Sequence, residues 1–180
     1  MNEEALVINL FGGPGTGKST LMAKLFAQLK ERDYEVEMSH EYVKDLVWEE
    51  SYKKIENQLY IFGKQHNRSY RLLNKINLII TDSPLLNSIV YYSGDNPHFS
   101  DMVMYEYKKM NNIGFYLERG FEYNDNGRYQ NLEEAKEVDR KYRELLDEND
   151  LEYYHIKMPY DIEDIINIID EKLKKTKELV

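Results

Sequence analysis

The sequence of 180 residues contains no cysteine. This absence excludes disulfide bonds, thiolate nucleophiles and zinc sites built on cysteine, and it is compatible with a reducing cytosol. The length is that of one domain of ordinary size, and it is sufficient to bury a substantial core. We therefore expect a single domain over residues 1–180.

An excess of basic residues is also missing. The chain has 24 Lys and Arg against 33 Asp and Glu, which gives a formal net charge of −9. Broad, nonspecific binding of nucleic acid usually needs a basic face, so this balance argues against nucleic acid as a partner. The net negative charge does not exclude a local basic cleft.

Long apolar runs are missing as well. No stretch approaches the length of a membrane span. The first residues, Met1-Asn2-Glu3-Glu4, lack the basic start and apolar stretch of a signal peptide. We therefore expect a cytoplasmic protein with no membrane partner.

What the chain does have is a phosphate-binding loop. Residues 12–19 read Gly-Gly-Pro-Gly-Thr-Gly-Lys-Ser and match G-x-x-x-x-G-K-[ST], the Walker A motif. A short apolar run of the buried-strand type precedes the loop over Leu6–Phe11, and Thr20–Lys30 follows it with leucines at helical spacing. Strand, glycine-rich turn and helix are the context that the motif needs. The alternative is a glycine-rich turn before an ordinary helix.

The chemistry of this loop follows from its glycines. They allow backbone torsions and a close approach that a Cβ would block, so that N–H groups can point inward at phosphate oxygens. Lys18 would reach the β- and γ-phosphates, and Ser19 would ligate Mg²⁺. ATP and Mg²⁺ are therefore the expected cofactors. The expected nucleotide-binding residues are Gly12, Gly13, Pro14, Gly15, Thr16, Gly17, Lys18, Ser19 and Thr20.

Strands that alternate with helices predict a parallel sheet covered on both faces. The expected strands are 5–11, 35–39, 78–81, 113–117 and 152–156. The expected helices are 17–32, 40–52, 53–74, 85–92, 100–110, 131–149 and one that begins at Asp161. The predicted architecture is a three-layer α/β fold of the P-loop NTPase type, with a five-stranded parallel sheet flanked by helices. Ligands of such sheets bind at the carboxyl ends of the strands.

Two carboxylates fall at those ends. Asp82 follows the apolar strand 78–81 and would hold Mg²⁺ directly or through water, completing what Ser19 begins. The alternative for Asp82 is to cap the helix that starts at Pro84. Glu41 follows the second strand and would accept the proton of an acceptor hydroxyl or orient that hydroxyl. The alternative for Glu41 is a favourable charge in the first turn of a helix.

Two arginines, Arg119 and Arg128, bracket a polar, glycine-containing loop after the fourth strand. Arginines on a closing lid stabilise the charge that phosphoryl transfer spreads over the equatorial oxygens. We expect such a lid around 119–130, with solvated surface arginines as the alternative. The expected catalytic residues are Lys18, Glu41, Arg119 and Arg128.

The predicted middle helix offers further acceptor-side candidates. Phe62 could stack on a base, although core packing is the simpler interpretation. Gln58 or Gln65 could read a base edge, and Arg68 or Arg71 could meet an acceptor phosphate. Lys44 is another possible acceptor-side cation, with a solvated surface lysine as the alternative. His66 is most simply a helix-surface or satisfied buried histidine, and Trp48 is more typical of core or surface packing than of a binding site.

Together, the phosphate loop, Asp82, Glu41 and the two arginines resemble the P-loop nucleoside and nucleotide kinase group. Within it the chain is similar to the small NadR-like and thymidylate-kinase-like enzymes, including phage-encoded ones. The resemblance implies nucleotide residues at Lys18 and Ser19, a strand-3 acid at Asp82 and lid arginines at Arg119 and Arg128. It departs from the group in two places. Lys44 replaces an arginine in the segment after Glu41, and Asp82-Ser83 replaces the Asp-Arg pair of many deoxynucleoside and thymidylate kinases.

This resemblance implies a kinase that transfers the γ-phosphoryl group of ATP to a small-molecule nucleoside or nucleoside monophosphate. Two alternatives stay open, namely a kinase that acts on a hydroxymethylated base in DNA and a regulatory P-loop ATPase. A homodimer is compatible with the sequence.

Overall fold

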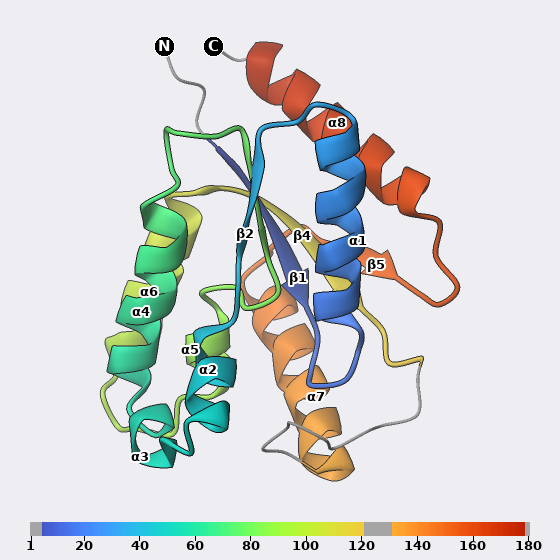
Figure 1. Cartoon of the computed structure of the whole chain (residues 1–180). Coiled ribbons are helices and arrows are strands. Elements are labelled where there is room, and N and C mark those ends of the chain that lie inside the picture. The colour runs from blue at the N-terminus through green and yellow to red at the C-terminus, as the bar shows by residue number, and fades with distance from the viewer. Residues whose placement is uncertain (1–4, 121–130, 179–180) are drawn as a thin grey trace.

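The computed structural model describes residues 5–120 and 131–178 and arranges them in three layers (Figure 1). The central layer is a five-stranded sheet of order β2-β3-β1-β4-β5, and all of its strand pairs are parallel. The predicted α/β fold is therefore confirmed. The strands are β1 (Leu6–Phe11), β2 (Val36–Ser39), β3 (Leu78–Thr81), β4 (Asn111–Leu117) and β5 (Tyr154–Ile156). The helices are α1 (Lys18–Glu31), α2 (Tyr42–Trp48), α3 (Tyr52–Ile55), α4 (Gln58–Tyr70), α5 (Asn87–Val90), α6 (Phe99–Lys108), α7 (Leu132–Glu148) and α8 (Ile162–Glu178).

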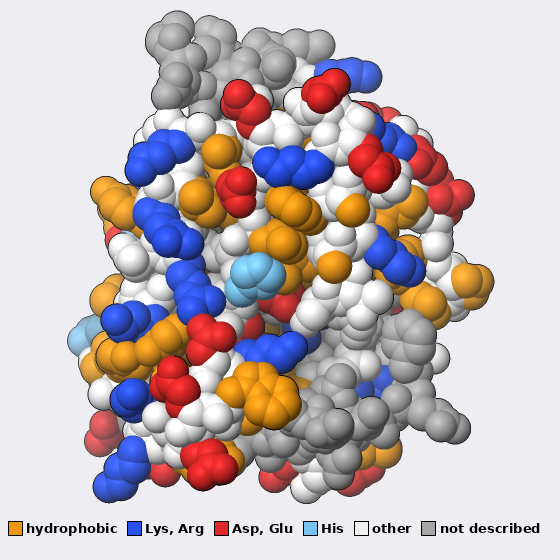
Figure 2. Space-filling view, viewed as in Figure 1, with side chains coloured by type: hydrophobic (Ala, Val, Ile, Leu, Met, Phe, Trp, Pro, Cys, Tyr) orange, Lys and Arg blue, Asp and Glu red, His pale blue; other side chains and the backbone are white. Residues whose placement is uncertain are grey.

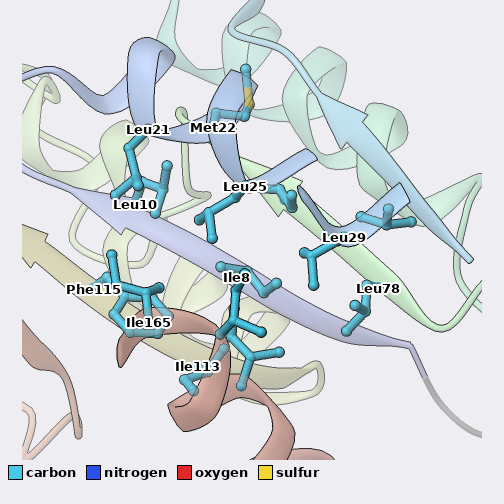
Figure 3. Packing of buried hydrophobic residues seen from close by; sticks show 14 of the residues in the cluster. Ile8, Leu10, Leu21, Met22, Leu25, Leu29, Leu78, Ile113, Phe115 and Ile165 are labelled. Atoms are coloured by element: carbon cyan, nitrogen blue, oxygen red, sulfur yellow. The ribbon is translucent and has the colours of Figure 1, made fainter. Parts of the chain in front are cut away.

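One face of the sheet is covered by α1 and α8. Leucines spaced along α1, among them Leu21, Leu25 and Leu29, are fully buried against strand residues such as Ile8 (Figure 3). Ile165 of α8 joins the same cluster. The helical spacing of these apolar residues explains why the segment after the phosphate loop folds as a helix and where it packs.

The other face is covered by α4, α5, α6 and α7. Phe62 of α4, Phe99 of α6 and Tyr142 of α7 are buried there against Phe11 and Tyr116 of the sheet. Because both faces are covered, the central strands β1 and β3 are buried along their whole length. This rigid sheet carries the segments that build the site.

The direction of the strand connections reverses between the neighbouring strands β1 and β3. β1 lies between β3 and β4, and the chain leaves β1 toward the β2 edge but leaves β3 toward β4. Such a reversal is where parallel sheets bind ligands, at the carboxyl ends of their strands. The phosphate loop after β1 and Asp82 after β3 both lie at this point. None of the helices in the described part of the chain is long and apolar enough to cross a bilayer.

The two expected helices over 40–52 and 53–74 were wrong in their boundaries. The chain leaves α2 at Trp48 and turns at Glu50, whose φ is 54°. A second break follows at Asn57, whose side chain accepts the N–H of Tyr60 and caps α4. Leu59, in the first turn of α4, is 57% exposed. The expected helix over 85–92 is limited to α5.

Candidate active site

The phosphate loop forms the turn between β1 and α1, as the motif predicts. Gly12 has a φ of 132°, and a Cβ at that position would lie 2.9 Å from the carbonyl oxygen of Leu117. A side chain there would therefore be strained and crowded. α1 begins at Lys18 with no acidic residue in its first turn, so the positive end of the helix faces the loop without a competing charge.

The ammonium group of Lys18 lies within this loop. Its Nζ donates to the carbonyl oxygens of Gly12 at 2.6 Å and Gly13 at 2.9 Å. Burial lowers the pKa of Lys18, while the nearby carboxylates of Glu41 and Asp82 act against that shift. A half-buried, partly desolvated cation of this kind attracts anionic oxygens strongly.

Ser19 and Asp82 contact each other, although they are 63 positions apart in sequence. Ser19 Oγ donates to Asp82 Oδ2 at 2.6 Å. Asp82 is only 6% exposed, and its other oxygen, Oδ1, is buried without a hydrogen-bond partner among the residues that the structure describes. A hydroxyl oxygen beside an unsatisfied carboxylate oxygen is the chemistry that Mg²⁺ prefers, so this pair fits a magnesium site. Asp82 makes no helix-capping contact, because α5 begins later, after Leu86.

Glu41 stands directly before α2 and lines the same pocket as Lys18 and Asp82. Burial raises the pKa of its carboxyl group, and the positive charge of Lys18 opposes the rise. The turn that carries Glu41 is held by Gln65 of α4. Gln65 accepts the N–H of Tyr42 at 3.0 Å and donates to the carbonyl oxygen of His40 at 3.2 Å.

A pocket of about 590 Å³ opens between the phosphate loop and α2 to α5. Figure 2 shows a hollow on this face with charged side chains inside it. Tyr142 and Asn87 line its inner part, and the hydroxyl group of Tyr142 donates to Asn87. Trp48 and Tyr52 lie at its exposed margin. The size is that of a small-molecule site.

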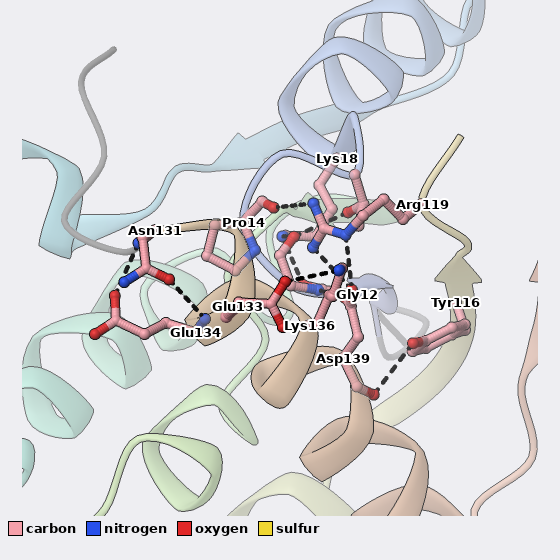
Figure 4. A network of polar contacts seen from close by, with 12 residues as sticks. Gly12, Pro14, Lys18, Tyr116, Arg119, Asn131, Glu133, Glu134, Lys136 and Asp139 are labelled. Carbon is pink, nitrogen blue, oxygen red and sulfur yellow. Dashed lines mark hydrogen bonds and ion pairs between the residues drawn. The ribbon is translucent and has the colours of Figure 1, made fainter. Parts of the chain in front are cut away.

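Arg119 follows β4 and contacts the phosphate loop from outside this pocket (Figure 4). Its Nη1 donates to the carbonyl oxygen of Pro14 at 2.8 Å. Its Nε and Nη2 donate to Asp139 Oδ2 at 3.0 and 2.8 Å. Arg128 and most of the expected lid lie outside the described residues. The structure therefore places Arg119 at the loop, and its catalytic role stays a prediction.

Asp139 is the site residue that sequence reasoning missed. It lies on α7, and its Oδ1 accepts the N–H of Gly13 at 2.6 Å. A signal was present in the sequence, because Ala135, Asp139 and Tyr142 fall on one face at helical spacing. An acid on an otherwise apolar helix face needs a partner.

The other acceptor-side candidates are engaged elsewhere. Phe62 packs in the core against Phe99, with ring centroids 6.2 Å apart. Gln58 lines the pocket but donates to the carbonyl oxygen of Ile55 at 3.0 Å. Arg68 pairs with Asp45 at 2.5 Å. These contacts account for the positions of the three side chains without a bound base or an acceptor phosphate.

Comparison with solved structures supports the assignment of the fold. Deoxyadenosine kinase from M. mycoides is 21% identical over 94% of this chain and 99% of its own, with a TM-score of 0.57. Thymidylate kinase from Ehrlichia chaffeensis is 14% identical over 92% of this chain and 98% of its own, with a TM-score of 0.59. Thymidylate kinase from Candida albicans is 14% identical over 97% of this chain and 93% of its own, also with a TM-score of 0.59. Identities this low show a common fold alone, the fold of P-loop nucleoside and nucleotide kinases.

No curated protein matches the sequence. One family model does, and its description, AAA domain, specifies a domain type and no reaction. The match runs over residues 7–164 and contains the phosphate loop, Glu41, Asp82, Arg119 and Asp139. Because this match spans most of the sequence, the chain belongs to the AAA domain family.

Proposed function

We propose that the protein is a kinase that transfers the γ-phosphoryl group of ATP to a small-molecule nucleoside or nucleoside monophosphate. One observation carries the proposal. Lys18, Ser19 and Asp82 line one pocket together with Glu41, whose carboxyl pKa is raised by burial. Phosphate-binding residues and a proton-accepting residue therefore face the same space.

The phosphate-binding side would act by position and charge. Backbone N–H groups of the loop and the start of α1 would hold the phosphates, and Lys18 Nζ would exchange the carbonyl oxygens of Gly12 and Gly13 for phosphate oxygens. Ser19 and Asp82 would hold Mg²⁺, which when bound neutralises charge on the phosphates. Positioning and electrostatics supply most of the catalysis in phosphoryl transfer.

The acceptor side would orient a hydroxyl group. Gln65 holds the backbone on both sides of Glu41, and this keeps Glu41 in the lining of the pocket. In its ionised form it would accept the hydroxyl proton as the new bond to phosphorus forms. Tyr142 and Asn87 would contact the rest of the acceptor in the inner pocket.

Replacing Asp82 by asparagine should weaken the response to magnesium. The amide oxygen of asparagine can still accept the Ser19 hydroxyl, so the local fold is kept while the negative charge is lost. We expect the Mg²⁺ concentration for half-maximal rate to rise about 10- to 100-fold. A Mg²⁺ titration of the initial rate measures this. Asp101→Asn, at an exposed position of α6, is the matched control. Equal titration curves for wild type and Asp82→Asn would contradict the metal-binding role.

A screen of acceptors tests the proposed reaction. ADP formation is followed with ATP and Mg²⁺ in the presence of nucleosides, nucleoside monophosphates and nicotinamide riboside, each added separately. We expect one of these classes to increase ADP formation well above the rate without acceptor. Phosphate incorporation into duplex DNA with hydroxymethylated bases, but not into free nucleotides, would instead establish the DNA-directed alternative. An ATPase rate that no acceptor changes would favour the regulatory ATPase.

A further inference from the structure

A carboxylate outside the pocket binds the phosphate loop directly. Asp139 lies on the buried face of α7 and is 9% exposed. Both of its oxygens are engaged, Oδ1 by the N–H of Gly13 and Oδ2 by the guanidinium of Arg119. A buried carboxylate with both oxygens satisfied by fixed donors is held in one orientation. The contacts of Asp139 therefore restrict the positions of the Gly13 backbone and of the Arg119 side chain.

The donors belong to the first half of the phosphate loop and to the end of β4. Arg119 returns to the same loop, because its Nη1 donates to the carbonyl oxygen of Pro14. Asp139 thus fixes Gly13 directly. It fixes Pro14 through Arg119, whose contacts with Asp139 and Pro14 are drawn in Figure 4. The Lys18 ammonium donates to the carbonyl oxygen of Gly13. Loop, arginine and lysine are consequently joined in one network around Gly13.

The identity of residue 13 supports this arrangement independently. The Walker A pattern leaves position 13 variable, yet glycine is the residue that the local space admits. A Cβ there would lie 2.6 Å from Asp139 Oδ1 and 2.6 Å from the carbonyl oxygen of Ala135. The backbone of the loop is therefore packed directly on the first turns of α7. Any side chain would separate the loop from the carboxylate that orients it.

We propose that Asp139 is a positioning residue that sets the geometry of the phosphate loop and holds the guanidinium of Arg119 against that loop. This role rests on the proposed kinase function. Asp139 is not among the residues that line the pocket, and it would act through Gly13 and Arg119. Two N–H groups of Arg119 donate to the same carboxylate oxygen, Oδ2, and this paired contact gives direction as well as attraction.

Two substitutions separate the two contacts. Asp139→Asn retains an oxygen that can accept the N–H of Gly13 but loses the charged partner of Arg119. We expect kcat to fall about 10²-fold, since misplacing a transition-state contact by about 1 Å has this effect, with KM for ATP changed less than about threefold. Asp139→Ala loses both contacts, so KM and Kd for Mg·ATP should also rise by about tenfold. The measurements are steady-state kinetics and titration calorimetry of Mg·ATP with the full chain.

A double-mutant cycle tests whether Asp139 acts through Arg119. Asp139→Asn leaves the guanidinium group of Arg119 in place but without its charged partner. Arg119→Gln removes the guanidinium group itself. If the carboxylate works by directing this arginine, the double variant should have the kcat of Arg119→Gln alone. Multiplied losses in the double variant would show that Asp139 acts independently of Arg119 and would overturn that part of the proposal.

A merely structural role predicts a different set of results. Asp147→Asn, at an exposed position farther along α7, is the matched control and should leave kcat and KM unchanged. All assays are run well below the lowest Tm in the set. Asp139 variants with lowered Tm but wild-type kcat, KM and Kd would overturn the proposal. If the wild-type chain transfers no phosphate, the proposed function fails, and the Kd of Asp139→Ala for Mg·ATP still decides whether Asp139 positions the loop.

Discussion

Replacing Lys18 by alanine is expected to lower phosphoryl transfer by about 10³-fold, the loss typical of removing one preorganised charged or hydrogen-bonding group from a transition state. The fold should survive, because Lys18 Nζ contacts only the carbonyl oxygens of Gly12 and Gly13 in the described structure apart from charge interactions. Burial lowers the pKa of Lys18, which shows that keeping its charge there opposes folding. We therefore expect a Tm no lower than that of wild type.

The measurements are kcat/KM for ATP and a thermal melt of the same preparation. Lys30→Ala is the matched control, because Lys30 lies at the exposed far end of the same helix, where it pairs with Glu37. That variant should retain wild-type kinetics. If Lys18→Ala transfers phosphate at the wild-type rate, the phosphate loop has no role in the reaction and the proposal is contradicted.

Replacing Glu41 by glutamine is expected to lower kcat by about 10²- to 10⁴-fold, the range for losing a general base. Glutamine keeps the shape of the side chain but cannot take the acceptor proton. The raised pKa of Glu41 means that the folded protein binds this proton more tightly than the unfolded chain does. Ionisation of Glu41 therefore opposes folding above its pKa, and Glu41→Gln should be at least as stable as wild type near pH 7.

The same pKa shift sets the pH dependence of the rate. Only the ionised carboxylate can accept a proton, so activity should fall as the pH drops through the pKa of Glu41. Because burial raises that pKa, the acid limb should lie above about pH 4.3, the ordinary value for glutamate. The measurement is kcat/KM across a pH series, with Glu49→Gln at the exposed end of α2 as the control. A wild-type rate for Glu41→Gln, or an acid limb that this variant retains, would contradict the assignment.

The parts of the site that could be predicted are those that the sheet topology brings together. A phosphate loop has a local pattern of its own, and the ends of parallel strands meet at one edge, so Ser19 and Asp82 could be paired from sequence. Glu41 could be placed at the same edge for the same reason. Neither inference needed knowledge of how the helices pack.

The parts that could not be predicted depend on helix packing and on local capping. Asp139 is 126 positions from Gly13, and only the docking of α7 onto the loop brings them together. Gln65 was a candidate to read a base, yet it satisfies backbone groups of the α2 turn. The divided middle helix depends on the cap at Asn57, which competes with helical continuation through a single hydrogen bond.

The fate of the γ-phosphoryl group tests the central claim most directly. ATP labelled in this group is incubated with the protein, Mg²⁺ and the acceptor class that increases ADP formation. The amounts of label in the acceptor and in inorganic phosphate are then measured. The account predicts that label enters the acceptor in step with ADP formation and that Lys18→Ala and Glu41→Gln abolish this transfer. Label released only as inorganic phosphate, at a rate indifferent to every acceptor, would contradict it.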